Sequence, residues 1–137
     1  MSPRRVGRTR PCGSADARAR LRQARLYLEV ATLVAGDEPG EHATVATANA
    51  VLAGIAAADA MCCAIAGERF RGDDHRRAAE YLGQVTGDQA CAGALRDLID
   101  LKDASHYGVR NVQVRNATRA VRKATQLVDA AAARVRS

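Results

Sequence analysis

The chain has 137 residues, the length of one domain, and it contains no tryptophan, one phenylalanine and three tyrosines. Its core must therefore be built from small aliphatic side chains, and the abundant alanine favours helices and excludes a fold made mainly of strands. The net charge of +6 is concentrated at the two ends, because residues 1–14 and 114–137 are both strongly basic and the segment between them is slightly acidic.

The first element in chain order is a basic segment, residues 1–14, that combines Pro, Gly, Arg and Ser without an apolar period. It predicts a flexible tail, followed by a single helical domain over residues 15–136. A first helix is expected over about residues 15–35, where alanines and leucines recur at steps of three and four residues and Gly36 provides a stop.

The second predicted helix, from about residue 43 to 66, is apolar on nearly every side, and Asp59 is its only charge. Its length would allow it to cross a bilayer. An aspartate near the centre of a spanning helix costs about 2.5–3.5 kcal/mol, however, and alanine returns little of that cost. The pattern therefore predicts the buried central helix of a soluble protein with no membrane partner. No apolar segment follows the early arginines, so we expect no secretory signal and a cytoplasmic protein.

Three further helices are predicted from periodicity and caps. Asp73 is expected to cap a short third helix that ends near Val85, a fourth covers about residues 89–106, and the last runs to about Arg134 with a regular apolar stripe. No strand pattern competes with them. The predicted fold class is all-α, a four- to five-helix up-and-down bundle.

The four cysteines, Cys12, Cys62, Cys63 and Cys91, show no CxxC spacing typical of a metal site. We expect free thiols that pack as small hydrophobic side chains in a reducing cytosol, with no metal and no cofactor.

Polar side chains on core-facing stripes are the candidate functional residues, because burying them unpaired is costly. Asp59 is in line with apolar residues of the second helix, His75 extends the inward row of the third, and Lys102 and His106 do so on the fourth. Each has an alternative structural interpretation, in which Asp59 is a buried charge paired with Lys102 or His75. A short antiparallel connection would bring His75 and His106 to the same end of the bundle.

At these residues the chain resembles the HEPN family, helical domains of prokaryotic defence and toxin–antitoxin systems, and in particular its short, alanine-rich actinobacterial members. The similarity covers roughly residues 20–132. Two segments carry it: Ala57-Ala58-Asp59-Ala60 leading to Arg71-Gly72-Asp73-Asp74-His75, and Leu98 to Tyr107 followed by a loop and the helix that contains Ala124-Thr125-Gln126-Leu127-Val128.

The resemblance implies a bundle that often forms a homodimer, and many family members cleave RNA without a metal through an Arg, four to six residues and a His. Arg69 and His75 fit that spacing, whereas Lys102 and His106 depart from it, because Lys replaces Arg and only three residues intervene. Lysine lacks the bidentate fork that arginine offers to phosphate. Other members bind nucleotide or RNA without cleaving it. Some partner an antitoxin or a small nucleotidyltransferase that modifies a tyrosine, a neighbourhood that Tyr107 matches approximately.

The leading functional hypothesis is a HEPN-like module of a toxin–antitoxin or defence system that binds nucleotide or RNA through a polar site at one end of the bundle. One alternative is a metal-independent ribonuclease toxin, and another is a non-catalytic structural or dimerisation protein. The two basic ends are equally compatible with nucleic-acid binding and with a solvated surface. The site residues expected under these hypotheses are His75, His106 and Lys102 as catalytic groups, Arg69, Arg71 and Tyr107 on phosphate, and Asp59 as a buried charge.

Overall fold

The computed structural model of the chain describes residues 8–36, 40–72, 74–107 and 113–136, with the side chains of residues 103–107 outside that description. The described residues form a helical bundle with a small two-stranded sheet, so the predicted all-α class is confirmed. The elements in chain order are β1 (Arg8–Pro11), α1 (Ser14–Ala35), α2 (Glu41–Ala66), β2 (Glu68–Arg71), α3 (His75–Thr86), α4 (Gln89–Tyr107) and α5 (Val114–Arg134).

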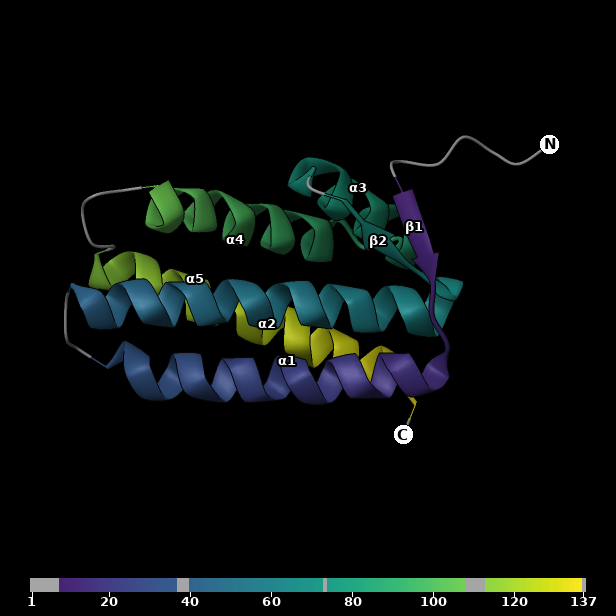
Figure 1. Ribbon diagram of the computed structural model, residues 1–137, viewed down its shortest axis with the longest axis horizontal. Coiled ribbons are helices and arrows are strands. Elements are labelled where there is room, and N and C mark those ends of the chain that lie inside the picture. Colours follow the sequence, from purple (N-terminus) through teal and green to yellow (C-terminus); the bar gives the residue numbers. More distant parts are fainter. Residues whose placement is uncertain (1–7, 37–39, 73, 108–112, 137) are drawn as a thin grey trace.

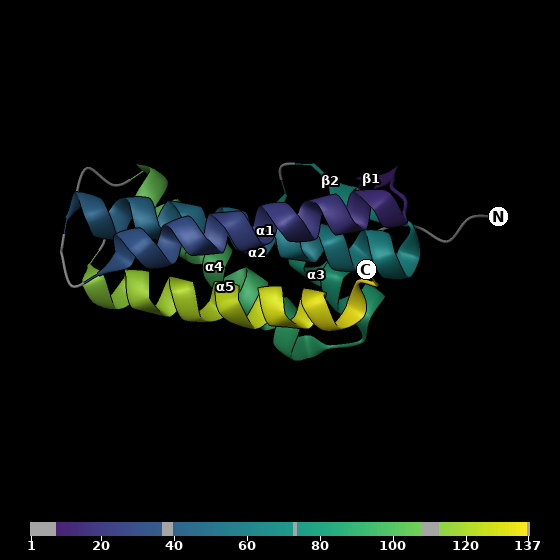
Figure 2. The same ribbon diagram turned by 90° about the horizontal axis from the view of Figure 1, so that it is seen from below.

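Helix α2 is the centre of the bundle and packs against all four other helices and against β2. Figure 1 shows α1 and α2 side by side and antiparallel, with α4 and α5 completing the bundle around α2. Figure 2, seen from below, shows that α5 also lies along α1, so the first and last helices are neighbours. The β1–β2 ribbon covers one end of α2, the same end at which α5 finishes.

Small side chains allow α2 to hold this central position. Alanines along its whole length are fully buried, and a Cβ added at Gly54 would collide with Leu98 Cδ1 and lie 3.2 Å from Leu127 Cδ1. Of the helices in the described ranges, α2 is the one that is long and apolar enough to cross a membrane, and 67% of that stretch is buried inside the bundle. This burial is what a soluble protein's core helix requires.

The sheet corrects the expectation of a flexible tail without strands. Residues 8–11 pair antiparallel with residues 68–71, while residues 1–7 lie outside the described ranges. The turn into β2 begins at Gly67, whose φ of +69° favours glycine and whose carbonyl accepts a hydrogen bond from the Cys12 N–H at 2.9 Å. Because the paired residues lie 57 to 63 positions apart in sequence, no local pattern predicts the pairing.

The cysteine prediction is wrong for two of the four residues. Cys12 and Cys63 form a disulfide that ties the end of β1 to the last turn of α2, with their Cα atoms 5.3 Å apart. Cys62 and Cys91 are free and buried. The ribbon supplies the physical reason, because strand pairing carries Cys12 from the expected tail to the surface of α2.

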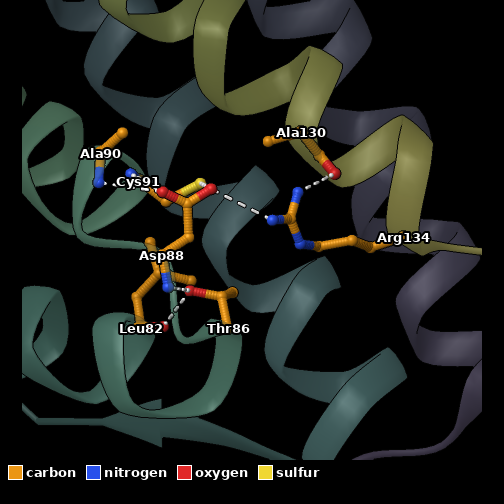
Figure 3. Close-up of polar contacts among 7 residues, drawn as sticks. All are labelled: Leu82, Thr86, Asp88, Ala90, Cys91, Ala130 and Arg134. Carbon is orange, nitrogen blue, oxygen red and sulfur yellow. Dashed lines mark hydrogen bonds and ion pairs between the residues drawn. The ribbon is translucent and has the colours of Figure 1, made fainter.

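Asp88 lies between α3 and α4 and joins these two helices to α5, as Figure 3 shows. Its Oδ1 accepts hydrogen bonds from the N–H groups of Ala90 and Cys91, at 2.9 and 3.3 Å, and so caps the start of α4. Its Oδ2 accepts from Arg134 Nη2 of α5 at 3.1 Å, and the same guanidinium donates to the Ala130 carbonyl. Thr86, which ends α3, accepts from the Asp88 N–H.

Candidate functional site: an arginine-lined cavity

Asp59 lies near the carboxyl end of α2 and is only 8% exposed. Its Oδ2 accepts hydrogen bonds from Arg20 Nη2 at 2.8 Å and Arg20 Nε at 3.2 Å, and lies 3.9 Å from Arg69 Nη1. Burial and pairing agree with the sequence analysis, but the expected partners, Lys102 and His75, are wrong. Arg20 takes their place because α1 and α2 are antiparallel and residues at similar distances from their connection lie opposite each other.

Burial raises the pKa of Asp59 above its usual value, and the positive charges of Arg20 and Arg69 oppose that rise. The Cys62 thiol, almost one turn further along α2, is affected in the same direction. Burial, with a smaller contribution from the Asp59 charge, raises the pKa of Cys62 to about 12. Cys62 is therefore a neutral thiol at physiological pH and a poor nucleophile.

The β1–β2 ribbon places four arginines in two directly opposed pairs, Arg8 with Arg71 and Arg10 with Arg69. Directly opposed residues of antiparallel strands project from the same face of the sheet, and like charges in that arrangement are destabilising. Within the described residues, Arg69 is the member of this set that has an ion pair, through Asp59. We call these four residues the arginine ribbon.

A cavity of about 270 Å³ opens between the ribbon and the helices. Its polar lining combines Arg20, Arg69 and Arg71 with Asp59 and His75. The opposite wall is apolar and comes from α2, α3 and α4, through Ile55, Ala58, Ala78, Leu95 and Ile99.

Two aromatic residues fix the ribbon at this cavity. Phe70 of β2 and Tyr81 of α3 both line it, with their ring centroids 6.4 Å apart. The Tyr81 hydroxyl donates a hydrogen bond to the Glu68 carbonyl at 2.9 Å. The ribbon is thus held to α3 on one side and, through the disulfide, to α2 on the other.

A second cleft, of about 640 Å³, lies on the other side of Arg20 and Arg69, which line both hollows. Arg10 and the Cys12–Cys63 disulfide also line this cleft. The two arginines that hold Asp59 therefore line both the cavity and the larger cleft beside the disulfide.

His75 is the first residue of α3, directly after the capping residue Asp74, whose Oδ1 accepts from the N–H groups of Arg76 and Arg77. Its Nε2 lies 3.4 Å from Lys102 Nζ of α4. An ammonium group can donate a hydrogen bond to an imidazole nitrogen that carries no proton.

Most of the residues chosen from the sequence meet at this place. One cavity is lined by Asp59, Arg69, Arg71 and His75. Lys102 does not line it but contacts His75. His106 and Tyr107, which the sequence analysis also chose, have side chains outside the described residues.

Sequence reasoning missed Arg20 and the two arginines of β1. The signal for Arg20 was available, because it lies about as far before the α1–α2 connection as Asp59 lies after it. Arg8 and Arg10 had no comparable signal. Among the residues that the structure describes, no three His, Cys, Asp or Glu side chains are grouped in a way that could hold a metal ion.

Comparison with known proteins finds no protein-family model that matches this chain, and no curated protein matches its sequence.

Proposed function

We propose that the arginine-lined cavity binds the phosphate group of a nucleotide or of an RNA, and that the chain is a HEPN-like binding module of a toxin–antitoxin or defence system. The family and its biological setting come from the sequence resemblance, with which a helical bundle is consistent. The binding site comes from the side chains around the cavity. The observation that carries it is the arginine ribbon with His75 and Arg20 beside it.

The opposed arginines support an anionic ligand on energetic grounds. Two like charges facing each other across a ribbon are unfavourable without a counter-charge, and Asp59 reaches only Arg69 among the four ribbon residues. A phosphate placed at Arg69 and Arg71 would supply that counter-charge. Guanidinium groups suit this task because their planar fork donates two parallel hydrogen bonds to phosphate oxygens.

The size and apolar wall of the cavity indicate which part of the ligand enters. A volume of about 270 Å³ is near the lower limit of small-molecule sites, which start at roughly 300 Å³. The cavity is therefore of a size for one nucleotide unit at most, with its phosphate at the arginines and its less polar part against Ile55, Leu95 and Ile99. Asp59 holds Arg20 and Arg69 in place before the ligand arrives.

Isothermal titration calorimetry with AMP tests the proposal. Arg69→Gln and Arg71→Gln each remove one guanidinium from the cavity and should weaken AMP binding about tenfold, since a charge-assisted bidentate contact is lost. Arg77→Gln is the matched control, because Arg77 is an exposed arginine that is paired with Asp74 and does not line the cavity. Absence of AMP binding to the unmodified chain, or equal losses in all three variants, would contradict the proposal.

The ribonuclease alternative is favoured by the contact between His75 and Lys102. A neutral imidazole can accept the proton of an RNA 2′-hydroxyl, whose oxygen then attacks the phosphorus while the bond to the 5′ oxygen breaks and that oxygen takes up a proton. In this scheme His75 or His106 acts as the base, and Lys102, Arg69 and Tyr107 neutralise or position the phosphate. Cleavage in the presence of EDTA should leave 2′,3′-cyclic phosphate ends, and His75→Ala or His106→Ala should abolish it.

The His75→Ala variant also distinguishes the binding-module and ribonuclease hypotheses from a purely structural protein. If His75 only satisfies a polar network, His75→Ala lowers the melting temperature and leaves the affinities for AMP and for RNA unchanged. Homodimerisation and association with an antitoxin or nucleotidyltransferase are further parts of the HEPN-like proposal. Light scattering of the purified chain tests the dimer directly, and a monomer at every accessible concentration would remove that part.

A further inference from the structure

The fold places arginines of the first helix beside the basic C-terminal end of the chain. Helices α1 and α5 are the first and last of the bundle, and they pack side by side with the start of α1 against the end of α5 (Figure 2). A groove of about 250 Å³ lies between them at this end. Four arginines line it, and we call it the α1–α5 groove: Arg18, Arg22, Arg25 and Arg136.

None of these four arginines has an ion pair within the described part of the chain, unlike Arg119, Lys123 and Arg134 of α5. Arg134 is paired with Asp88, and Arg119 and Lys123 are paired with Asp97. The remaining lining of the groove, Leu21, Ala132 and Val135, carries no charge. Its positive charge is therefore available to a ligand.

The spacing of the arginines suits an extended ligand. Arg18, Arg22 and Arg25 follow one another at four and three residues, which places them on one side of α1 over about 10 Å. A nucleic-acid strand carries one phosphate per about 3.4 Å of helix axis, so this length reaches more than one phosphate. A single small anion would contact only part of the set.

We propose that the α1–α5 groove binds the phosphodiester backbone of a nucleic-acid strand without reading its base sequence. The described lining offers guanidinium donors and no acidic or amide side chain that would select a base edge. A strand can enter a groove between two helices, whereas a flat lipid surface reaches poorly into it. The site is separate from the cavity, because Arg20 projects from α1 toward Asp59 of α2 and does not line this groove.

Fluorescence anisotropy with labelled oligo(U) and oligo(dT) of about 20 nucleotides tests this proposal. The triple variant Arg18→Gln, Arg22→Gln, Arg25→Gln should weaken binding of both probes at least about tenfold. The matched control changes the net charge equally at three exposed arginines elsewhere, Arg76→Gln, Arg77→Gln and Arg96→Gln, and should change affinity less than about twofold. No binding by the unmodified chain at about 50 mM salt, or equal losses in the two triple variants, would overturn the proposal.

Salt dependence gives an independent measure. Contact with three or four phosphates of a single strand predicts a slope of about −2 to −3 for log affinity against log salt, and the groove variant should flatten it. A slope near zero would overturn the groove as a backbone site. So would binding to vesicles of phosphatidylcholine and phosphatidylserine without binding to either oligonucleotide, because the surface would then recognise a membrane.

The two sites can fail separately. The groove variant should keep the AMP affinity of the unmodified chain, whereas Arg69→Gln should lose it. Loss of AMP binding in the groove variant would show that the two regions are one site and would overturn the inference of a separate groove.

Discussion

Two aspartates of this protein are paired with arginine in environments that act on them in opposite directions. Asp59 is 8% exposed, and burial raises its pKa despite Arg20 and Arg69. The side chain of Asp88 is 36% exposed. Hydrogen bonds from the side chain and the N–H of Cys91 lower the pKa of Asp88, with smaller contributions from Ala90 and Arg134.

The comparison shows that an arginine partner does not by itself determine how readily an aspartate is charged. At Asp88 the donors are the start of a helix that needs a cap, so the charged carboxylate serves the fold (Figure 3). At Asp59, burial disfavours the charged carboxylate, which is the form that pairs with Arg20 and Arg69. An ion pair that lines a cavity although burial disfavours its carboxylate charge is a stronger candidate for function than an ion pair that caps a helix.

The largest expected effect comes from the disulfide, which anchors the ribbon beside Asp59 and has no counterpart at Asp88. Cys12→Ser removes a cross-link between residues 51 apart in sequence. In the chain-entropy description this costs about 4 kcal/mol of unfolding free energy, or a fall of about 14 °C in melting temperature. Thermal unfolding followed by circular dichroism measures it.

Reductant provides the control for this variant. It should lower the melting temperature of the unmodified chain to that of Cys12→Ser and leave the variant unchanged. AMP affinity should fall with the released ribbon, while oligonucleotide binding at the α1–α5 groove persists. Equal melting temperatures for the variant and the oxidised protein would show that the disulfide does not support the cavity end.

The second effect is a pH dependence at Asp59. Because its folded-state pKa is raised, the folded protein binds this proton more tightly than the unfolded chain, so its contribution to stability grows as pH falls through the raised pKa toward 3.8. Asp59→Asn removes that contribution. The unfolding free energy of the unmodified chain relative to the variant should therefore decrease as pH rises from about 4 to 7, measured by urea unfolding. A difference that increases with pH would mean that the arginines outweigh burial.

The smallest effect is expected at Asp88, where stability should depend on pH in the opposite direction to Asp59. Asp88→Asn keeps a good capping residue but loses the charge, so the variant should be slightly less stable than the unmodified chain at neutral pH. Because the pKa of Asp88 is lowered, this difference should vanish as pH falls through that pKa, below 3.8. The same urea series measures both aspartates, and parallel pH profiles for the two variants would contradict the comparison.

Local patterns predicted the helices well. The expected helix at about residues 15–35 lies at Ser14–Ala35, and the central helix expected at about 43–66 lies at Glu41–Ala66. Periodic apolar residues and terminal glycines act within a few residues of each other, so they can be read from one sequence. Asp59 and His75 were chosen from such apolar stripes, whereas Arg69 and Arg71 were chosen from the family resemblance, and all four residues line one cavity.

Features that depend on distant segments were not predictable in the same way. β1 is four residues long and has no apolar period, and its partner strand is about 60 residues away. Without that pairing nothing brings Cys12 to Cys63 or Arg10 opposite Arg69. The pairing of Arg20 with Asp59 required the register of two helices, which the apolar stripes alone do not specify.

The Cys12–Cys63 bond also makes the chain between these residues, α1 and most of α2, into a closed covalent ring. A protease that cuts this ring once opens it without releasing a fragment, so the nicked protein would travel as one band on a denaturing gel and as two after reduction. Arg20 and Asp59 both belong to the ring. A molecule damaged in the connection between its first two helices would thus keep these two residues on one covalently joined body.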